Sequence, residues 1–76
     1  MTEKQLGEIL SQMYMRAPEG YKVTFIHLFG IKYAEEIIKN KLSIKKILEY
    51  SNVKPSFVTE ISKGIKLSRY VTNTIN

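Results

Sequence analysis

The sequence predicts a small all-α domain of four helices, and three observations support this fold class. The chain has 76 residues, of which 43% are hydrophobic, so it is long enough for one domain with a thin core. Apolar residues recur at intervals of three and four positions in four segments, as they do on one face of a helix. Residues that begin or end helices separate these segments. We therefore expect helices over about residues 2–16, 24–39, 43–51 and 55–63.

The first expected helix begins at a capping box formed by Thr2 and Gln5, whose side chains would close reciprocal hydrogen bonds with the backbone. Its apolar stripe follows at helical spacing and consists of Leu6, Ile9, Leu10, Met13 and Ala17. Pro18 ends this helix, because the residue before a proline avoids the helical region. Glu19 and Gly20 then supply a turn.

The second segment is the densest in apolar residues, and we expect it to form the central, most buried helix. Thr24 would cap its beginning, and Asn40 would end it in a left-handed conformation. Gly30 lowers helix stability by about 1 kcal/mol relative to alanine and marks a place where the helix could kink. Residues 23–26 could also form a strand, but no partner strand is predicted, so a helix is favoured.

The third and fourth helices are expected to form a two-helix corner. Ser43 caps the third helix, and Asn52 tolerates the positive φ that a tight turn requires. Pro55 fits the first turn of the fourth helix, where no N–H is needed, and Gly64 would end that helix. Residues 72–76 are expected to fray. The core expected from all four helices consists of Leu6, Ile9, Leu10, Met13, Phe29, Ile37, Ile47, Val58 and Ile61.

Positive charge is concentrated in the second half of the sequence. Residues 1–38 contain four basic and five acidic residues, a net charge of −1. Residues 39–76 contain eight basic and two acidic residues, a net charge of +6. A one-sided positive charge is typical of proteins that face a polyanion such as nucleic acid. A basic surface that is only solvated is the other interpretation.

The sequence offers little for catalysis, a cofactor or a metal. It has no cysteine, and His27 is the only histidine, so we expect that side chain to be packed and hydrogen-bonded. Glu35 and Glu36 would point about 100° apart on a helix, so they cannot form a facing acid–base pair. They are expected to partner Lys32 or Lys39. We therefore expect no enzyme, no cofactor and no metal site.

No sign of a membrane-spanning or secretory segment is present. No stretch approaches the roughly 18 consecutive apolar residues of a membrane-spanning helix. The N-terminus is polar and lacks the basic region and apolar stretch of a signal peptide. The expectation is a soluble cytoplasmic protein without a membrane partner.

Residues 43–64 carry the pattern of a helix-turn-helix. Ser43 stands at the cap of its first helix, and Gly64 stands at the end of its second. The apolar offsets that would place both inner faces on one core hold Ile47, Val53, Val58 and Ile61. In these positions the segment resembles the helix-turn-helix of the phage-repressor and Cro-like family.

The resemblance covers about a third of the chain and has three departures. Leu48 stands where the family prefers a small residue, and Asn52 replaces the usual turn glycine. The supporting helices, over residues 1–40, precede the motif, whereas the family usually places further helices after it. The resemblance implies one helix-turn-helix-like domain over residues 1–76, with its DNA-binding part at the C-terminal end.

The resemblance also implies which residues would contact double-stranded DNA. The side chains that would face base edges from the fourth helix are Ser56, Thr59, Glu60 and Lys63. The residues that would contact phosphates are Ser43, Lys45, Lys46, Lys54, Lys66 and Arg69. Glu60 could accept a hydrogen bond from a cytosine amine, and Lys54 and Lys63 suit guanine or phosphate. Any one of the lysines could instead be a solvated surface charge.

Together these features predict a non-catalytic DNA-binding module. It would act as a small transcriptional regulator, as a phage or mobile-element protein, or as part of a larger host protein. Specific binding is expected to need a homodimer or a fused second domain, because one monomer of this size reads few base pairs. The main alternative is a helix-turn-helix reused for protein–protein contacts, with Phe25, Phe29 or Tyr33 on the binding face. RNA binding is a third possibility.

Overall fold

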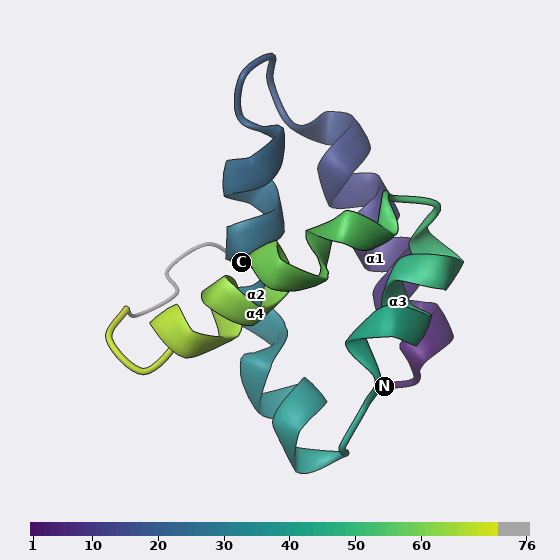
Figure 1. The fold of residues 1–76 in the computed structure, drawn as a ribbon, viewed down its shortest axis with the longest axis vertical. Helices are drawn as coiled ribbons and strands as arrows, with labels where there is room; N and C mark the ends of the chain where they lie inside the picture. Colours follow the sequence, from purple (N-terminus) through teal and green to yellow (C-terminus); the bar gives the residue numbers. More distant parts are fainter. Residues whose placement is uncertain (72–76) are drawn as a thin grey trace.

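The computed structural model describes residues 1–71, and this part of the chain contains four α-helices and one short 3₁₀-helix (Figure 1). The elements in chain order are α1 (Glu3–Arg16), α2 (Lys22–Lys39), α3 (Ile44–Ser51), η1 (Pro55–Phe57) and α4 (Val58–Leu67). No strand occurs in these residues, which confirms the all-α prediction. None of the described helices is both long and apolar enough to cross a membrane. The expected fraying of residues 72–76 lies outside the described part of the chain.

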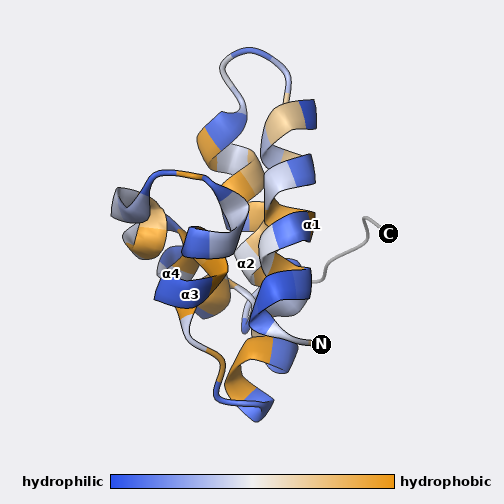
Figure 2. Cartoon of the chain, turned by 90° about the vertical axis from the view of Figure 1, so that its right-hand side faces the viewer, coloured by the Kyte–Doolittle hydropathy of each residue, from blue (hydrophilic) through white to orange (hydrophobic). Residues whose placement is uncertain are grey.

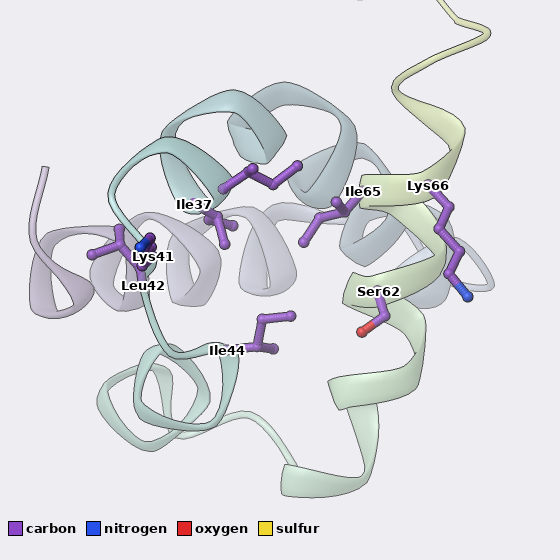
Figure 3. A pocket seen from close by; sticks show the side chains of 8 residues that line it. Ile37, Lys41, Leu42, Ile44, Ser62, Ile65 and Lys66 are labelled. Atoms are coloured by element: carbon purple, nitrogen blue, oxygen red, sulfur yellow. The ribbon is translucent and has the colours of Figure 1, made fainter.

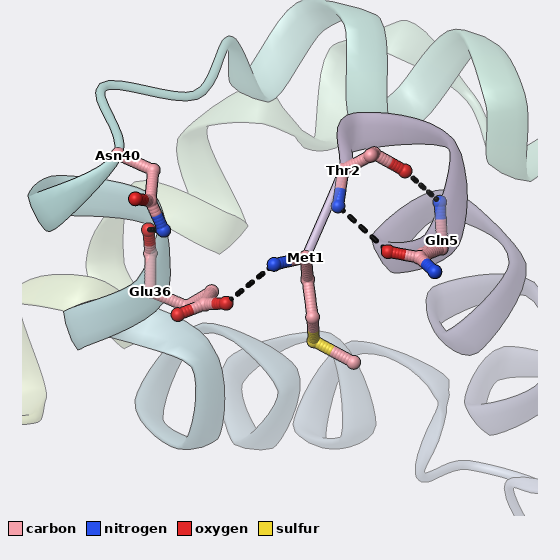
Figure 4. A network of polar contacts seen from close by, with 5 residues as sticks. All are labelled: Met1, Thr2, Gln5, Glu36 and Asn40. Atoms are coloured by element: carbon pink, nitrogen blue, oxygen red, sulfur yellow. Dashed lines mark hydrogen bonds and ion pairs between the residues drawn. The ribbon is translucent and has the colours of Figure 1, made fainter.

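Three of the expected helix signals are confirmed at the atomic level. The Thr2 amide donates to Gln5 Oε1 over 2.8 Å, and the Gln5 amide donates to Thr2 Oγ1 over 3.1 Å, which completes the capping box (Figure 4). Ser43 caps α3 by accepting from the Lys46 amide over 3.3 Å. Asn52 adopts a φ of 62° directly after α3, as the tight turn requires.

The boundaries of α2 differ from the prediction at both ends. The helix begins at Lys22, so Tyr21 rather than Thr24 is its N-cap, and no side chain accepts a capping hydrogen bond there. The Tyr21 amide donates to the Pro18 carbonyl over 2.9 Å, so the preceding turn leads directly into the helix. The expectation that Thr24 caps α2 was therefore wrong.

At the other end of α2, Lys41 rather than Asn40 takes the left-handed conformation. Lys41 has a φ of 53°, whereas Asn40 is the C-cap with a φ of −95°. The Leu42 amide donates to the Ile37 carbonyl over 3.0 Å, and the Lys41 amide donates to the Ile38 carbonyl over 3.2 Å. This pair of bonds is a Schellman motif, which requires the left-handed residue one position after the C-cap.

Gly64 does not end the fourth helix, contrary to the prediction. α4 continues to Leu67, and Gly64 lies buried inside it against α2. A Cβ atom at Gly64 would collide with the carbonyl oxygen of His27, and one at Gly30 would lie 2.6 Å from the carbonyl oxygen of Ile61. The two glycines therefore serve a close crossing of α2 and α4. α2 runs through Gly30 as one helix.

The helices pack mainly as two pairs, α1 with α3 and α2 with α4, while α3 and α4 touch each other less (Figure 1). Gly7 allows the backbone of α3 to approach α1 closely. A Cβ atom at Gly7 would lie 2.5 Å from Tyr50 Cβ and 2.7 Å from the Ile47 carbonyl oxygen. Each pair thus depends on glycine at its crossing, and α4 takes its position chiefly from α2.

Hydrophobic residues gather between the helices, and hydrophilic residues line the outward side of α1 (Figure 2). Of the nine expected core residues, six are buried: Leu6, Leu10, Phe29, Ile37, Ile47 and Ile61. Three are only partly buried and pack against the core: Ile9, Met13 and Val58. The core also contains Val53, one of the apolar offsets of the motif, and three residues that were not expected there: Ile26, Ala34 and Leu48. Leu48 thus fills the interior where the Cro-like pattern has a small residue.

The N-terminus joins α1 to the end of α2. The Met1 amine lies 2.7 Å from Glu36 Oε1 and forms an ion pair with it (Figure 4). This hydrogen bond and the positive charge of the amine lower the pKa of Glu36, and the charge of Lys39 adds a smaller effect. The sequence analysis expected Glu36 to partner Lys32 or Lys39, but its ion-pair partner is the Met1 amine.

Candidate nucleic-acid interface

The exposed face of α4, together with η1 before it, is the candidate surface for nucleic acid. Thr59, Lys63 and Lys66 are exposed, and their spacing of three and four positions places them on one side of the helix. Ile61 and Gly64 are buried on the opposite side. Ser56, Thr59 and Lys63, three of the four residues expected to face base edges, are therefore accessible.

Glu60, the fourth of these residues, lies to one side of this face and contacts α2. Its Oε1 lies 2.6 Å from His27 Nε2, and its Oε2 lies 3.7 Å from Lys63 Nζ. The Glu60 side chain is only 24% exposed. His27 is thus packed and hydrogen-bonded, as the sequence predicted. The carboxylate expected to accept from cytosine already has two partners within the protein.

The hydrogen bond with His27 is the largest cause of a lowered pKa at Glu60, and the positive charge of Lys63 acts in the same direction. A carboxylate with a lowered pKa stabilises the folded state above its unfolded pKa. That stabilisation is lost as the pH falls through the folded pKa. The contact between α2 and α4 should therefore weaken in acid.

We expect Glu60→Gln to flatten the acid side of the stability profile. In the wild type the melting temperature should fall as the pH is lowered below about 4.5, the ordinary value for this group. In Glu60→Gln this fall should be smaller, because no carboxylate remains to be protonated. Thermal melts between pH 3 and about 6 measure the slope. Glu8→Gln, at an exposed position of α1, is the control, and equal flattening in both variants would contradict this role of Glu60.

Ser43, one of the expected phosphate contacts, is also engaged within the protein. Its amide donates to Glu3 Oε2 over 2.5 Å, and its hydroxyl accepts from the Lys46 amide. The N-terminus of α3 thus attracts an anion, as expected, but that anion is the carboxylate of Glu3. A phosphate approaching Ser43 would meet this negative charge.

The other expected phosphate contacts are all exposed: Lys45, Lys46, Lys54, Lys66 and Arg69. None of them has an ion-pair partner within residues 1–71. Lys66 and Arg69 line one groove, and Lys63 and Lys66 line a neighbouring pocket, so these three side chains lie on one continuous surface. Lys45 and Lys46 lie in the first turn of α3, on the other helix of the corner.

The exposed face of α4 extends further than the sequence predicted. A shallow pocket of about 310 Å³ is lined by His27, Lys63, Lys66, Leu67 and Tyr70. Leu67 and Tyr70 are 42% and 85% exposed. Sequence reasoning did not place these two residues on this face of the helix, because it ended the helix at Gly64. The spacing of Thr59, Lys63, Leu67 and Tyr70 would have revealed the stripe had the helix been continued.

The helix-turn-helix character extends over nearly the whole chain. A family model described as an HTH-like domain matches residues 2–74. Comparisons with curated proteins and with solved structures found no match. The matched range includes α1 and α2 as well as the segment 43–64, so the two supporting helices are part of the same family pattern.

Proposed function

The chain belongs to the family of HTH-like domains, and on that premise we propose that it is a non-catalytic module that binds double-stranded DNA through α4. One observation carries this proposal. The last helix of the fold exposes a polar and basic face while its buried face is held on α2 at the crossing of Gly30 and Gly64. A helix presented in this way suits the major groove, which admits one α-helix.

We assign the contact residues by two properties of each side chain, its exposure and whether its polar group already has a partner within the protein. Ser56, Thr59 and Lys63 would approach base edges, because they are exposed on η1 and α4. The phosphate contacts would come from both helices of the corner and from the ends of α4, through Lys45, Lys46, Lys54, Lys66 and Arg69. Glu60 and Ser43 are left out of this interface, because His27 and Glu3 already occupy their polar groups.

The finer proposal is that the module acts in transcriptional regulation, as its resemblance to the Cro-like pattern implies. A single copy of this size covers few base pairs, so a regulator built on it would use a homodimer or a further domain. The alternative function, protein–protein binding through a face formed by Phe25, Phe29 or Tyr33, is less well supported by the structure. Phe29 is completely buried, and Phe25 and Tyr33 are partly buried, so these three residues do not form an exposed apolar face.

The test is a titration of a mixed-sequence 20-base-pair duplex, labelled with fluorescein, at about 50 mM and 200 mM salt. Each phosphate contact contributes about −0.9 to the slope of log affinity against log salt. Five contacts predict a slope of about −4 to −5, so the affinity should fall by a factor of about 10² to 10³ across this range. Absence of saturable binding at the lower salt concentration, or an affinity unaffected by salt, would contradict the proposal.

A further inference from the structure

An apolar groove lies where the end of α2 and the beginning of α3 face α4. It has a volume of about 450 Å³. Ile44 of α3 and Ile65 of α4 point toward the space between the helices, and Ile37 and Leu42 lie at the α2 side (Figure 3). Ile38 also lines the groove, and it is 62% exposed. A large aliphatic side chain is thus left in contact with water at the edge of an apolar hollow.

The charged residues that line this groove are all basic. Lys41 and Lys66 line it, and a second groove of about 470 Å³ continues from Ile38, Ile65 and Lys66 toward Arg69 and Tyr70. No acidic residue lines either groove. The surface therefore combines an apolar floor with a positively charged rim.

DNA matches only the rim. Phosphates would neutralise Lys66 and Arg69, but a duplex exposes little apolar surface beyond the thymine methyl groups. The apolar floor formed by Ile38, Ile44 and Ile65 would remain uncovered. Burial of apolar surface is favourable by about 25 cal/mol per Å², so an occupant with apolar side chains gains free energy that DNA does not.

A second copy of the chain matches only the floor. In a two-fold dimer each groove would face the same groove of the other copy. Lys41, Lys66 and Arg69 would then approach their own equivalents, and like charges brought together oppose association. The occupant that fits both the floor and the rim carries apolar side chains flanked by carboxylates.

We propose that this groove is a docking site for an acidic amphipathic segment of another protein. Apolar side chains spaced three and four residues apart on such a segment enter between Ile38, Ile44 and Ile65. Its Asp and Glu side chains pair with Lys41, Lys66 and Arg69. This mode of binding, an amphipathic helix in an apolar groove, needs no change in the four-helix fold.

The same segment would oppose DNA binding. Lys66 lines this groove, Arg69 lines the second groove that continues from it, and both are proposed phosphate contacts. A carboxylate paired with either side chain removes a cation from the DNA surface and adds a negative charge beside it. This regulatory consequence rests on the proposed function, whereas the docking itself does not.

The test is a selection of random 16-residue peptides displayed on phage, carried out with the whole chain in the absence of DNA. The test variant is Ile38→Glu, which places a negative charge in the groove at a position that is already exposed. Val23→Glu is the matched control, because Val23 is an exposed aliphatic residue near the other end of the same helix. Circular dichroism melts establish that both variants fold.

Wild type and Val23→Glu should enrich peptides that combine acidic residues with apolar residues three and four positions apart. Ile38→Glu should not enrich them and should bind the selected peptides at least about tenfold more weakly, which corresponds to 1.4 kcal/mol. A second variant, Lys41→Glu with Lys66→Glu, retains the apolar floor and should lose the same peptides. In a labelled wild-type chain the bound peptide should shift the amide resonances of Ile38, Ile44 and Ile65.

Three outcomes of the selection would overturn the docking proposal. The selection could enrich no peptides, it could enrich the same peptides with Ile38→Glu, or it could enrich peptides without acidic residues. A wild type that dimerises with rising concentration, when Ile38→Glu does not, would show that a second copy occupies the groove instead. A selected peptide that binds the groove in a chain that fails to bind DNA would support the docking site and contradict only the proposed function.

Discussion

Replacing Gly64 by alanine is expected to destabilise the protein, although alanine is the better helix former by about 1 kcal/mol. Gly64 lies in the middle of α4, where a Cβ atom would collide with the backbone carbonyl oxygen of His27 and approach Gly30. A backbone carbonyl cannot rotate away as a flexible side chain can, so α4 must move away from α2. Overpacking of this kind costs about 1–3 kcal/mol, and occasionally more.

We expect a net loss of up to about 2 kcal/mol in the free energy of unfolding for Gly64→Ala, measured by urea denaturation, because the gain in helix propensity offsets about 1 kcal/mol of the overpacking cost. For a domain of this size, a loss of about 2 kcal/mol corresponds to a fall of about 8–16 °C in melting temperature. Thr59→Ala is the matched control, because Thr59 lies on the exposed face of the same helix and should change stability by no more than about 0.5 kcal/mol. A more stable Gly64→Ala would show that the glycine has no packing role.

Gly30→Ala should act through the same crossing. A Cβ at Gly30 would lie 2.6 Å from the Ile61 carbonyl oxygen and 3.0 Å from the Gly64 Cα atom. Once one substitution has moved α2 and α4 apart, the Cβ atom of the second substitution has more space and collides less. The double variant should therefore lose less stability than the two single losses together, as expected for residues in contact.

Local signals in the sequence predicted the ends of α1 and α3 well, because caps and turns depend on neighbouring residues. Thr2 with Gln5, Ser43 and Asn52 all behave as predicted, and each acts within about three residues of its own position. Gly64 shows that local signals cannot identify a contact with a distant helix. A glycine that closes a helix and a glycine that allows another helix to approach both lack a Cβ atom, and only the position of α2 distinguishes the two roles.

The residues of the candidate site were likewise predictable only where local helical spacing determines their accessibility. The accessible positions Ser56, Thr59 and Lys63 follow from helical spacing alone. Glu60 could not be judged from the sequence, because its partner, His27, lies 33 residues away on another helix. Ser43 is similar, since the carboxylate that occupies its amide belongs to a residue 40 positions earlier. Long-range contacts decide which polar groups remain free, and the sequence pattern does not contain them.

The groove was missed for a related reason. Ile37 and Ile38 are adjacent apolar residues in the predicted central helix, and both could have belonged to the core. Side chains one position apart on a helix point about 100° apart, so one helix face cannot bury both. The packing of α4 on α2 buries Ile37 and leaves Ile38 exposed. The expected core contained Ile37 and not Ile38, but the groove beside Ile38 also needs Ile44 and Ile65 from other helices, and the sequence pattern does not bring these residues together.

Removal of the basic residues of the corner in pairs is expected to have the largest effect on DNA binding. The first pair is Lys45→Ala with Lys46→Ala, in α3, and the second is Lys66→Ala with Arg69→Ala, at the end of α4. If each side chain contacts a phosphate, each pair should reduce the magnitude of the salt slope by about 2. At 0.1 M salt the affinity should fall about 60-fold for each pair and more than about 10³-fold for the quadruple variant.

The matched control for each pair is Lys4→Ala with Arg16→Ala, which removes the same charge from exposed positions in the N-terminal half. Lys22 is unsuitable as a control, because its Nζ donates to the Tyr14 carbonyl over 2.7 Å and lies over the Tyr14 ring. The control should change the affinity by only a few-fold, since charges that do not touch phosphates act through a field that salt screens. An equal loss from the control would show that net charge, rather than the surface of α3 and α4, determines binding. If only the pair on α4 has an effect, the DNA contacts α4 without α3, and the helix-turn-helix docking would be wrong even though DNA binding itself would stand.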